Sequence, residues 1–262
     1  NNPRISVHHA SQVIGMTEHP GQALRKKKDA SVVVATRLVH DKRCDAVVAP
    51  GSTGAAVAAA LFGLGRIKGI DRPVIATPMP TTSGITVMLD SGANANSKAK
   101  HLVQGALMGV EYAKLLMGKS NPTVGLLNIG EEATKGNEVA LTAYPILEKL
   151  KAINFYGNVE GRDIPQGVVD VVVCDGFVGN VVLKFAEGLV TGLSKMVKDA
   201  IMTSGPFVKL GALLIKPALK KFAKRIDHTE NGGAPLLGVN GVFMIAHGSS
   251  KAKEIRTAIT IC

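Results

Sequence analysis

Four glycine-rich segments of this sequence also carry Ser, Thr, Asn or Asp and could together bind an anion. They are 49–54 (APGSTG), 89–94 (LDSGAN), 128–132 (NIGEE) and 174–180 (CDGFVGN). Each lies between a predicted strand and a predicted helix. Glycine lets backbone N–H groups approach an anion, and the N-terminus of the following helix adds the positive end of its dipole. One such turn is ordinary, but four indicate a shared anion or phosphate site at the carboxyl ends of the strands.

Other catalytic patterns are missing from the sequence. It contains no GxxxxGK[ST], GxSxG, HExxH or CxxC, which disfavours a P-loop nucleotidase, an α/β-hydrolase and common zinc sites. His247 stands between the apolar run 242–246 and Gly248, where it could bind phosphate, act as a base or be structural. Cys174 ends an apolar run, so we expect a buried residue rather than a nucleophile.

Apolar runs alternate with helical patterns from end to end. We expect strands at 4–7, 45–49, 74–77, 85–89, 123–128, 153–156, 168–174 and 242–246. We expect helices at about 21–39, 54–64, 97–117, 135–150, 178–203 and 249–259. Several strands are apolar at consecutive positions, as in a parallel sheet covered on both faces. The pattern predicts an α/β, doubly wound, mainly parallel sheet in a single domain over residues 1–262.

Composition narrows the classes of partner. Lys and Arg number 31 against 20 Asp and Glu, so the chain carries a net charge of +11 and favours anionic partners. Aromatic residues make up 4%, with no Trp, which disfavours nucleic-acid binding by base stacking. No uncharged apolar run approaches about 20 residues, so we do not expect an integral membrane protein. Three well-separated cysteines and the lack of a signal peptide favour the cytoplasm.

Two basic surfaces have two interpretations each. The run Arg25–Lys28 is either a solvated helix face or a docking surface for an acidic partner. Residues 207–226, within a helical protrusion at about 204–228, are either a packed surface helix or a basic amphipathic hairpin on anionic lipid. We expect a new helix to begin at Pro217. The apolar stripe comprises Ile215, Leu219, Phe222 and Ile226, flanked by Lys216, Lys220 and Lys224, with Leu210, Leu213 and Leu214 before it.

In order along the chain, these motifs resemble the phosphate acyltransferase family of bacterial phospholipid synthesis, known as PlsX. The matching segments are 25–31 (RKKKDAS), 51–55 (GSTGA), 89–94 (LDSGAN), 127–132 (LNIGEE), 157–163 (GNVEGRD), 174–180 (CDGFVGN), 232–238 (GGAPLLG) and 247–249 (HGS). They span essentially the whole chain. The family usually begins with a strand and an Asp-x-Met-Gly-Gly-Asp turn, so we expect this chain to be N-terminally incomplete. Its first glycine-rich turn usually reads Ala-Gly-Asn-Thr-Gly, whereas Ser52 stands here.

The resemblance implies that a long-chain acyl carrier protein reacts with inorganic phosphate to give acyl phosphate and free carrier. It also implies a fold similar to phosphotransacetylases and isocitrate dehydrogenases, a homodimer, and no metal or organic cofactor. The acyl phosphate is lipid-tailed, so we expect a cytoplasmic protein that associates peripherally with anionic membrane. There it would supply a membrane-bound glycerol-3-phosphate acyltransferase.

On this basis the site residues divide into three groups. The expected catalytic residues are Asp175, Lys184 and His247. The expected substrate- and phosphate-binding residues are Ser52, Thr53, Asp90, Asn94, Glu131, Asn158, Glu160 and Asn180. The expected membrane contacts are Leu210, Leu214, Leu219 and Phe222.

Two alternatives stay open at this point. One is a short-chain phosphate acetyl- or butyryltransferase that uses coenzyme A. The other is a non-catalytic basic scaffold on membrane surfaces.

Overall fold

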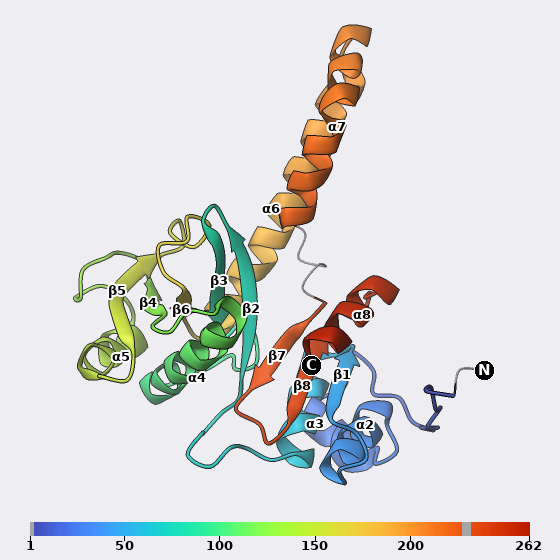
Figure 1. Ribbon diagram of the computed structural model, residues 1–262. Helices are drawn as coiled ribbons and strands as arrows, with labels where there is room; N and C mark the ends of the chain where they lie inside the picture. Colours follow the sequence, from blue (N-terminus) through green and yellow to red (C-terminus); the bar gives the residue numbers. More distant parts are fainter. Residues whose placement is uncertain (1–2, 227–231) are drawn as a thin grey trace. The chain divides into compact units, whose positions relative to one another are not determined.

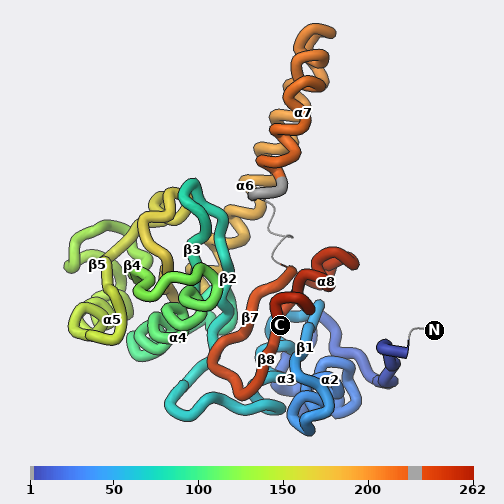
Figure 2. Tube along the Cα trace, viewed as in Figure 1, coloured from blue at the N-terminus to red at the C-terminus, as the bar shows by residue number. Residues whose placement is uncertain are grey.

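The computed structural model describes residues 3–226 and 232–262, and the chain forms two compact units. The first unit comprises Asn1–Ala76 and Gly232–Cys262, and the second comprises Thr77–Asn231. The chain therefore leaves the first unit, builds the second and returns, as the colours of Figure 2 trace from blue to red.

The first unit is built on strands β1 (Ala46–Pro50), β8 (Val242–Ala246), β7 (Ala234–Leu237) and the start of β2 (Val74–Thr81), in that order. β1 and β8 are parallel, whereas β7 is antiparallel to both of its neighbours. The helices of this unit are α1 (Pro20–Lys26), α2 (Ser31–His40), α3 (Thr53–Gly63) and α8 (Ala252–Ile261). Val47 of β1 and Phe243 and Met244 of β8 are buried.

The second unit continues from β2 through β3 (Gly84–Leu89), β6 (Val171–Val173), β4 (Thr123–Asn128) and β5 (Asn154–Glu160), in that order across the sheet. β3 with β6, β6 with β4 and β4 with β5 pair in parallel. Helices α4 (Ala99–Met117) and α5 (Glu138–Lys149) pack on these strands. All three residues of β6 are buried, as expected for a strand covered on both faces.

The predicted α/β fold with a mainly parallel sheet is confirmed. β1, β3, β4 and β8 lie within one residue of the predicted bounds. The predicted strand at 4–7 is wrong: these residues form no strand, and the side chains of Ile5 and Val7 are 70% and 93% exposed. β7 was missed because its sequence, APLL, is short and contains a proline.

The predicted helix over 21–39 is two helices, because residues between them bind a distant segment. The carboxylate of Asp29 accepts hydrogen bonds from the backbone N–H of Ser11 at 2.7 Å and from its hydroxyl at 2.6 Å. The backbone N–H of Gln12 donates to the carbonyl of Asp29 at 3.1 Å. Such partners cannot be read from local helical periodicity.

Two long helices, α6 (Gly176–Thr203) and α7 (Pro206–Ile226), project from the sheet of the second unit (Figure 1). α7 runs through Pro217 rather than beginning there, which corrects the predicted helix start. The side chains of Lys224 and Ile226, and residues 227–228 of the predicted protrusion, lie outside the described part. Among the described helices, α6 alone is long and apolar enough to cross a membrane, and a single such helix is weak support for a span.

Candidate functional site

Asp90 and Asp175 lie at the carboxyl ends of two adjacent parallel strands. Leu89 of β3 pairs with Val173 of β6. The ladder extends beyond them, because the N–H of Asp90 donates to the carbonyl of Cys174 at 3.1 Å. Parallel pairing therefore brings together two glycine-rich segments that are about 80 residues apart in sequence.

The carboxylate of Asp90 organises the segment that follows β3. Its Oδ1 accepts hydrogen bonds from the N–H groups of Gly92 at 3.1 Å and Ala93 at 2.9 Å. Its Oδ2 accepts from the backbone N–H and the side-chain amide of Asn94, each at 2.8 Å. Asp90 is only 2% exposed, and a buried carboxylate is tolerated when such donors compensate its lost hydration. Asp90 therefore holds Asn94 in place.

Two glycines let the start of α6 pack directly on this segment. A Cβ at Gly176 would lie 2.5 Å from the carbonyl oxygen of Asn94 and 2.8 Å from Oδ2 of Asp90. A Cβ at Gly179 would collide with the carbonyl oxygen of Asp90 and lie 2.9 Å from Sγ of Cys174. Glycine at both positions thus decides how closely α6 approaches the end of β3.

Polar and charged side chains lie at the start of α6. Asp175 is its N-cap, and Oδ1 accepts from the N–H groups of Phe177 at 3.0 Å and Val178 at 3.1 Å. Asn180 is exposed, and its Cγ lies 3.5 Å from where a Cβ of Gly92 would stand. We call Asp90, Asn94, Asp175 and Asn180 the strand-end cluster.

Lys184 extends the strand-end cluster along α6, because it follows Asn180 by one helical turn. Its Nζ forms an ion pair with Oε2 of Glu187 at 2.8 Å, and its side chain is 52% exposed. The ammonium group can therefore turn from a weak surface ion pair to an incoming anion. That anion would also meet the positive end of the α6 dipole.

The predicted residues on β5 and after β4 have other partners. Asn158 is buried, and its amide nitrogen donates to the carbonyl of Glu132 at 2.8 Å, while its Oδ1 has no partner in the described part of the chain. Glu160 forms an ion pair with Arg162 at 2.7 Å. Glu131 is exposed in the segment between β4 and α5. Within the described part of the chain, no hydrogen bond joins these side chains to the strand-end cluster.

The first unit brings Ser52 and Thr53 close to the end of β8. β1 and β8 pair to their last residues, Pro50 with Ala246, and a Cβ at Gly248 would lie 3.7 Å from Cα of Gly51. Ser52 is the N-cap of α3, and its hydroxyl accepts from the N–H of Ala55 at 3.4 Å. Thr53 is exposed at the first turn of α3.

The imidazole of His247, in the first unit, is oriented by Ser249. The N–H of Ser249 donates to Nδ1 of His247 at 3.2 Å, and the Ser249 hydroxyl lies 2.6 Å from the same nitrogen. Because a backbone N–H can only donate, this bond assigns Nδ1 as the acceptor and places the proton of the neutral ring on Nε2. His247 is exposed and so presents an N–H donor. Sequence reasoning missed Ser249 as its orienting partner, although the spacing of two residues could have indicated it.

Cys174 is buried, as expected. Burial, followed by the negative charges of Asp90 and Asp175, raises the pKa of its thiol well above the ordinary value. A thiol is nucleophilic as its thiolate, so this environment opposes a covalent role. Within the described residues, no three His, Cys, Asp or Glu side chains gather in a way that could hold a metal ion.

Comparison with known proteins shows strong similarity over the whole chain. A family model described as "Fatty acid synthesis protein" matches residues 1–262. A phosphate acyltransferase of Desulfitobacterium hafniense (strain DSM 10664 / DCB-2) is 57% identical over 259 residues, covering 98% of this chain and 77% of that protein. A phosphate acyltransferase of Heliobacterium modesticaldum is 58% identical over 258 residues, covering 98% and 76%.

Solved structures with a similar fold are more distant. A phosphotransacetylase from Streptococcus pyogenes superposes with a TM-score of 0.59 at 17% identity, covering 91% of this chain and 68% of that one. The EutD phosphotransacetylase from Staphylococcus aureus has a TM-score of 0.57 at 17% identity, with the same coverage. These likenesses confirm the expected phosphotransacetylase-like fold.

Proposed function

Because this chain belongs to the phosphate acyltransferase family, we propose that it transfers a long-chain acyl group from acyl carrier protein to inorganic phosphate. The products are acyl phosphate, an intermediate for phospholipid synthesis, and free carrier. The observation that carries this proposal is the strand-end cluster. It presents an exposed amide, Asn180, near the N-terminal end of a long helix, and the ammonium of Lys184 lies one helical turn further along.

In the proposed reaction a phosphate oxygen attacks the thioester carbonyl carbon, a C–O bond forms and the C–S bond breaks. The proton that phosphate loses balances the one that the carrier thiolate gains. Asn180 and Lys184 hold the phosphate, and Asp90 acts as a positioning residue through Asn94. Holding the dianion near the carbonyl supplies most of the catalysis by orientation and electrostatics.

His247 suits two roles on an acyl thioester. Its Nε2–H can donate to the carbonyl oxygen as negative charge develops there, or to the sulfur as it departs. Ser52 and Thr53 offer hydroxyl groups at the start of α3 to an anion. A direct attack by phosphate needs no acyl-enzyme, in accord with the raised pKa of the Cys174 thiol.

The proposal is tested by comparing donors. Purified protein is given long-chain acyl carrier protein, the matching acyl-coenzyme A or acetyl-coenzyme A, with and without phosphate, and acyl phosphate and free thiol are measured. We expect phosphate-dependent turnover with the highest kcat/KM for the carrier thioester. A preference for acetyl-coenzyme A would favour the short-chain transferase, and no turnover with any donor would favour the membrane scaffold.

We further propose that α7 docks on anionic membrane on the cytoplasmic side. The apolar side chains of Leu210, Leu214 and Phe222 are 57%, 76% and 60% exposed, and Leu219 is partly exposed beside them. Burying a few of them contributes about 1.5–3 kcal/mol for each fully buried side chain. Each nearby lysine adds about 1 kcal/mol against an anionic surface. Binding on this basis is reversible and weakens with salt.

The exposed apolar face of α6 supports the proposed homodimer. Phe185, Leu189 and Met196 recur at helical spacing and are 67%, 47% and 67% exposed. A second copy covering this face would remove it from water, as in other symmetric dimers. Light scattering at micromolar concentration checks the mass of the particle, and a monomer would contradict the proposal.

A further inference from the structure

The basic run Arg25–Lys28 separates into two sets of side chains in the structure. The side chain of Lys27 is bound by the segment that precedes α1. Its Nζ donates to the carboxylate of Glu18 at 2.7 Å and to the carbonyl of Val13 at 2.6 Å. Arg25 and Lys28 instead line a cavity of about 400 Å³ in the first unit. The run is therefore neither a uniform solvated face nor a uniform binding surface.

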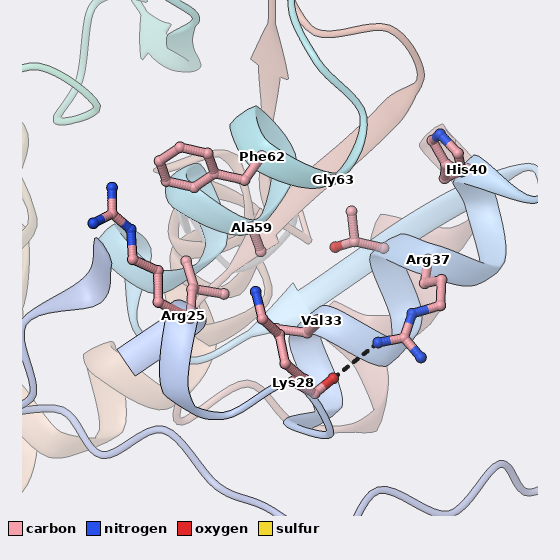
Figure 3. Close-up of a pocket in the computed structure, with 10 residues that line it drawn as sticks. Arg25, Lys28, Val33, Arg37, His40, Ala59, Phe62 and Gly63 are labelled. Atoms are coloured by element: carbon pink, nitrogen blue, oxygen red, sulfur yellow. Dashed lines mark hydrogen bonds between the residues drawn. The ribbon is translucent and has the colours of Figure 1, made fainter. Parts of the chain in front are cut away.

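This cavity, which we call the α1–α3 groove, has cationic rims and an apolar floor. Arg25, Lys28 and Arg37 supply the cations, His40 lies beside them, and Leu24, Val33, Ala59 and Phe62 supply apolar surface. Figure 3 shows Phe62 and Ala59, both on α3, beside the space around which Arg25, Lys28 and Arg37 lie. Phe62 is 71% exposed, although large aromatic side chains are usually buried.

Arg25 and Lys28 of the groove are not paired with acidic side chains of the described chain, whereas Arg37 interacts electrostatically with the carboxylate of Asp29. The guanidinium of Arg37 donates to the carbonyl of Lys28 at 3.0 Å rather than to a carboxylate. Arg25 and Lys28 have no ion pair among the described residues, and the imidazole of His40 contacts the carboxylate of Asp41 at 3.0 Å. Most of the chain's net charge of +11 also lies in this unit.

We propose that the α1–α3 groove docks an acidic amphipathic helix of the acyl carrier protein, an inference that rests on the proposed function. Carboxylates of that helix would meet Arg25, Lys28 and Arg37, and an apolar side chain would cover Phe62. Exposed cations spread over α1, the turn that follows it and α2 suit a protein surface better than a small phosphate, which is usually held by converging buried donors. Aromatic and arginine side chains are also those most enriched in protein interfaces.

The position of the groove along α3 fits this role. Phe62 lies at the C-terminal end of α3, whose N-terminal end carries Ser52 and Thr53. A helix of 11 residues is about 16 Å long at 1.5 Å per residue. A carrier docked at the C-terminal end of α3 would therefore have to extend its thioester, on its flexible prosthetic arm, toward the N-terminal end of this helix.

The test separates docking from chemistry by using two donors. We compare the wild type, the double variant Arg25→Glu/Lys28→Glu, the variant Phe62→Ser and a control with the same change in charge, Lys68→Glu/Lys251→Glu. Both control lysines are exposed in the first unit and lie outside the groove. Activity is measured with acyl carrier protein and with acyl-pantetheine, which lacks the acidic protein. The Kd for free carrier is measured by calorimetry.

We expect both groove variants to raise KM and Kd for the carrier. The double variant should raise them by about tenfold or more at low salt, because its reversed charges repel the acidic partner. The control should change them by less than about threefold, and acyl-pantetheine turnover should be unchanged in every variant.

If wild type uses the carrier and groove variants match the control, the docking inference fails while the proposed function stands. An equal loss of activity with acyl-pantetheine also overturns docking. No turnover of acyl carrier protein by wild type overturns the proposed function itself.

Discussion

Asn94 donates both its backbone N–H and its side-chain amide to one oxygen of Asp90, each at 2.8 Å. This pair is buried where β3 ends, and the start of α6 packs against it. Asp90 thereby links the shape of one glycine-rich segment to the position of the helix that carries Asn180 and Lys184. The stability of the cluster and its capacity to bind phosphate should therefore change together.

Replacing Asp90 by Asn should destabilise the protein and weaken phosphate use. The new amide NH₂ cannot accept hydrogen bonds, so two buried donors lose their partner, which lowers the free energy of unfolding by about 2–3 kcal/mol. Urea unfolding followed by circular dichroism, together with KM for phosphate, measures both effects. Asp199→Asn, on an exposed part of α6, is the control and should change stability by less than about 0.5 kcal/mol. Equal stability of both variants would contradict the role of Asp90.

Alanine at two glycines of α6 should have opposite effects. At Gly179 the added Cβ collides with the carbonyl of Asp90, so Gly179→Ala should lower both the free energy of unfolding and activity. At Gly188 a Cβ would meet nothing within 4 Å, and Gly188→Ala should stabilise the helix by about 0.5–1 kcal/mol. Thermal unfolding of the two variants measures both changes in stability. Stabilisation by Gly179→Ala would show that α6 does not pack on β3 as described.

Asn180→Ala and Lys184→Ala should raise the phosphate requirement without unfolding the protein, because both side chains are exposed. Each removes a donor to a charged ligand, which weakens phosphate binding on the order of tenfold or more. Steady-state kinetics with varied phosphate give KM, and Lys198→Ala, further along α6, serves as control. Unchanged phosphate kinetics in both variants would place the anion elsewhere.

Asp170 should contribute stability that is lost in acid. Burial would raise the pKa of its carboxyl, but hydrogen bonds from Lys119 at 2.5 Å and from Thr123 at 2.9 and 3.1 Å lower it below the ordinary value. The folded protein thus holds the carboxylate more strongly than the unfolded chain does. This contribution is complete above the unfolded pKa of about 3.9 and disappears as pH falls through the lower folded pKa.

Asp170→Asn should therefore be less stable than wild type near pH 7, and the gap should narrow as the pH falls below about 4. Urea unfolding at a series of pH values measures it. A gap that stays constant with pH would show that the carboxylate charge is not the cause.

Leu214→Glu should release the protein from anionic vesicles without abolishing activity on soluble substrate. The change places a charge on the exposed apolar surface of α7, and its burial in lipid is unfavourable. Vesicle flotation in anionic and neutral lipid measures binding. Leu115→Glu, at a leucine of α4 that is 86% exposed, is the matched control. If wild type and Leu214→Glu float identically in both lipids, the apolar surface of α7 is a protein contact instead.

Features that depend on neighbouring residues could be predicted from the amino-acid sequence. Consecutive apolar residues located β4 and β8, because strands buried on both faces need them. Glycines beside Asp and Asn located the strand ends, and their order along the chain indicated the family. Charge and amphipathic spacing indicated the basic surfaces of α1 and α7.

The partner of each side chain, in contrast, is known only from the folded chain. Residues 11 and 12 form hydrogen bonds with Asp29 at a point where periodicity would continue the helix. Ile5 and Val7 form no strand and are exposed. Lys27 turns to Glu18 while its neighbours line the groove. A local sequence pattern predicts only the backbone conformation of a segment and which of its faces is buried. Hydrogen bonds such as that from Cys174 to Leu89 join residues that are distant in sequence, and these arise only when the whole chain packs.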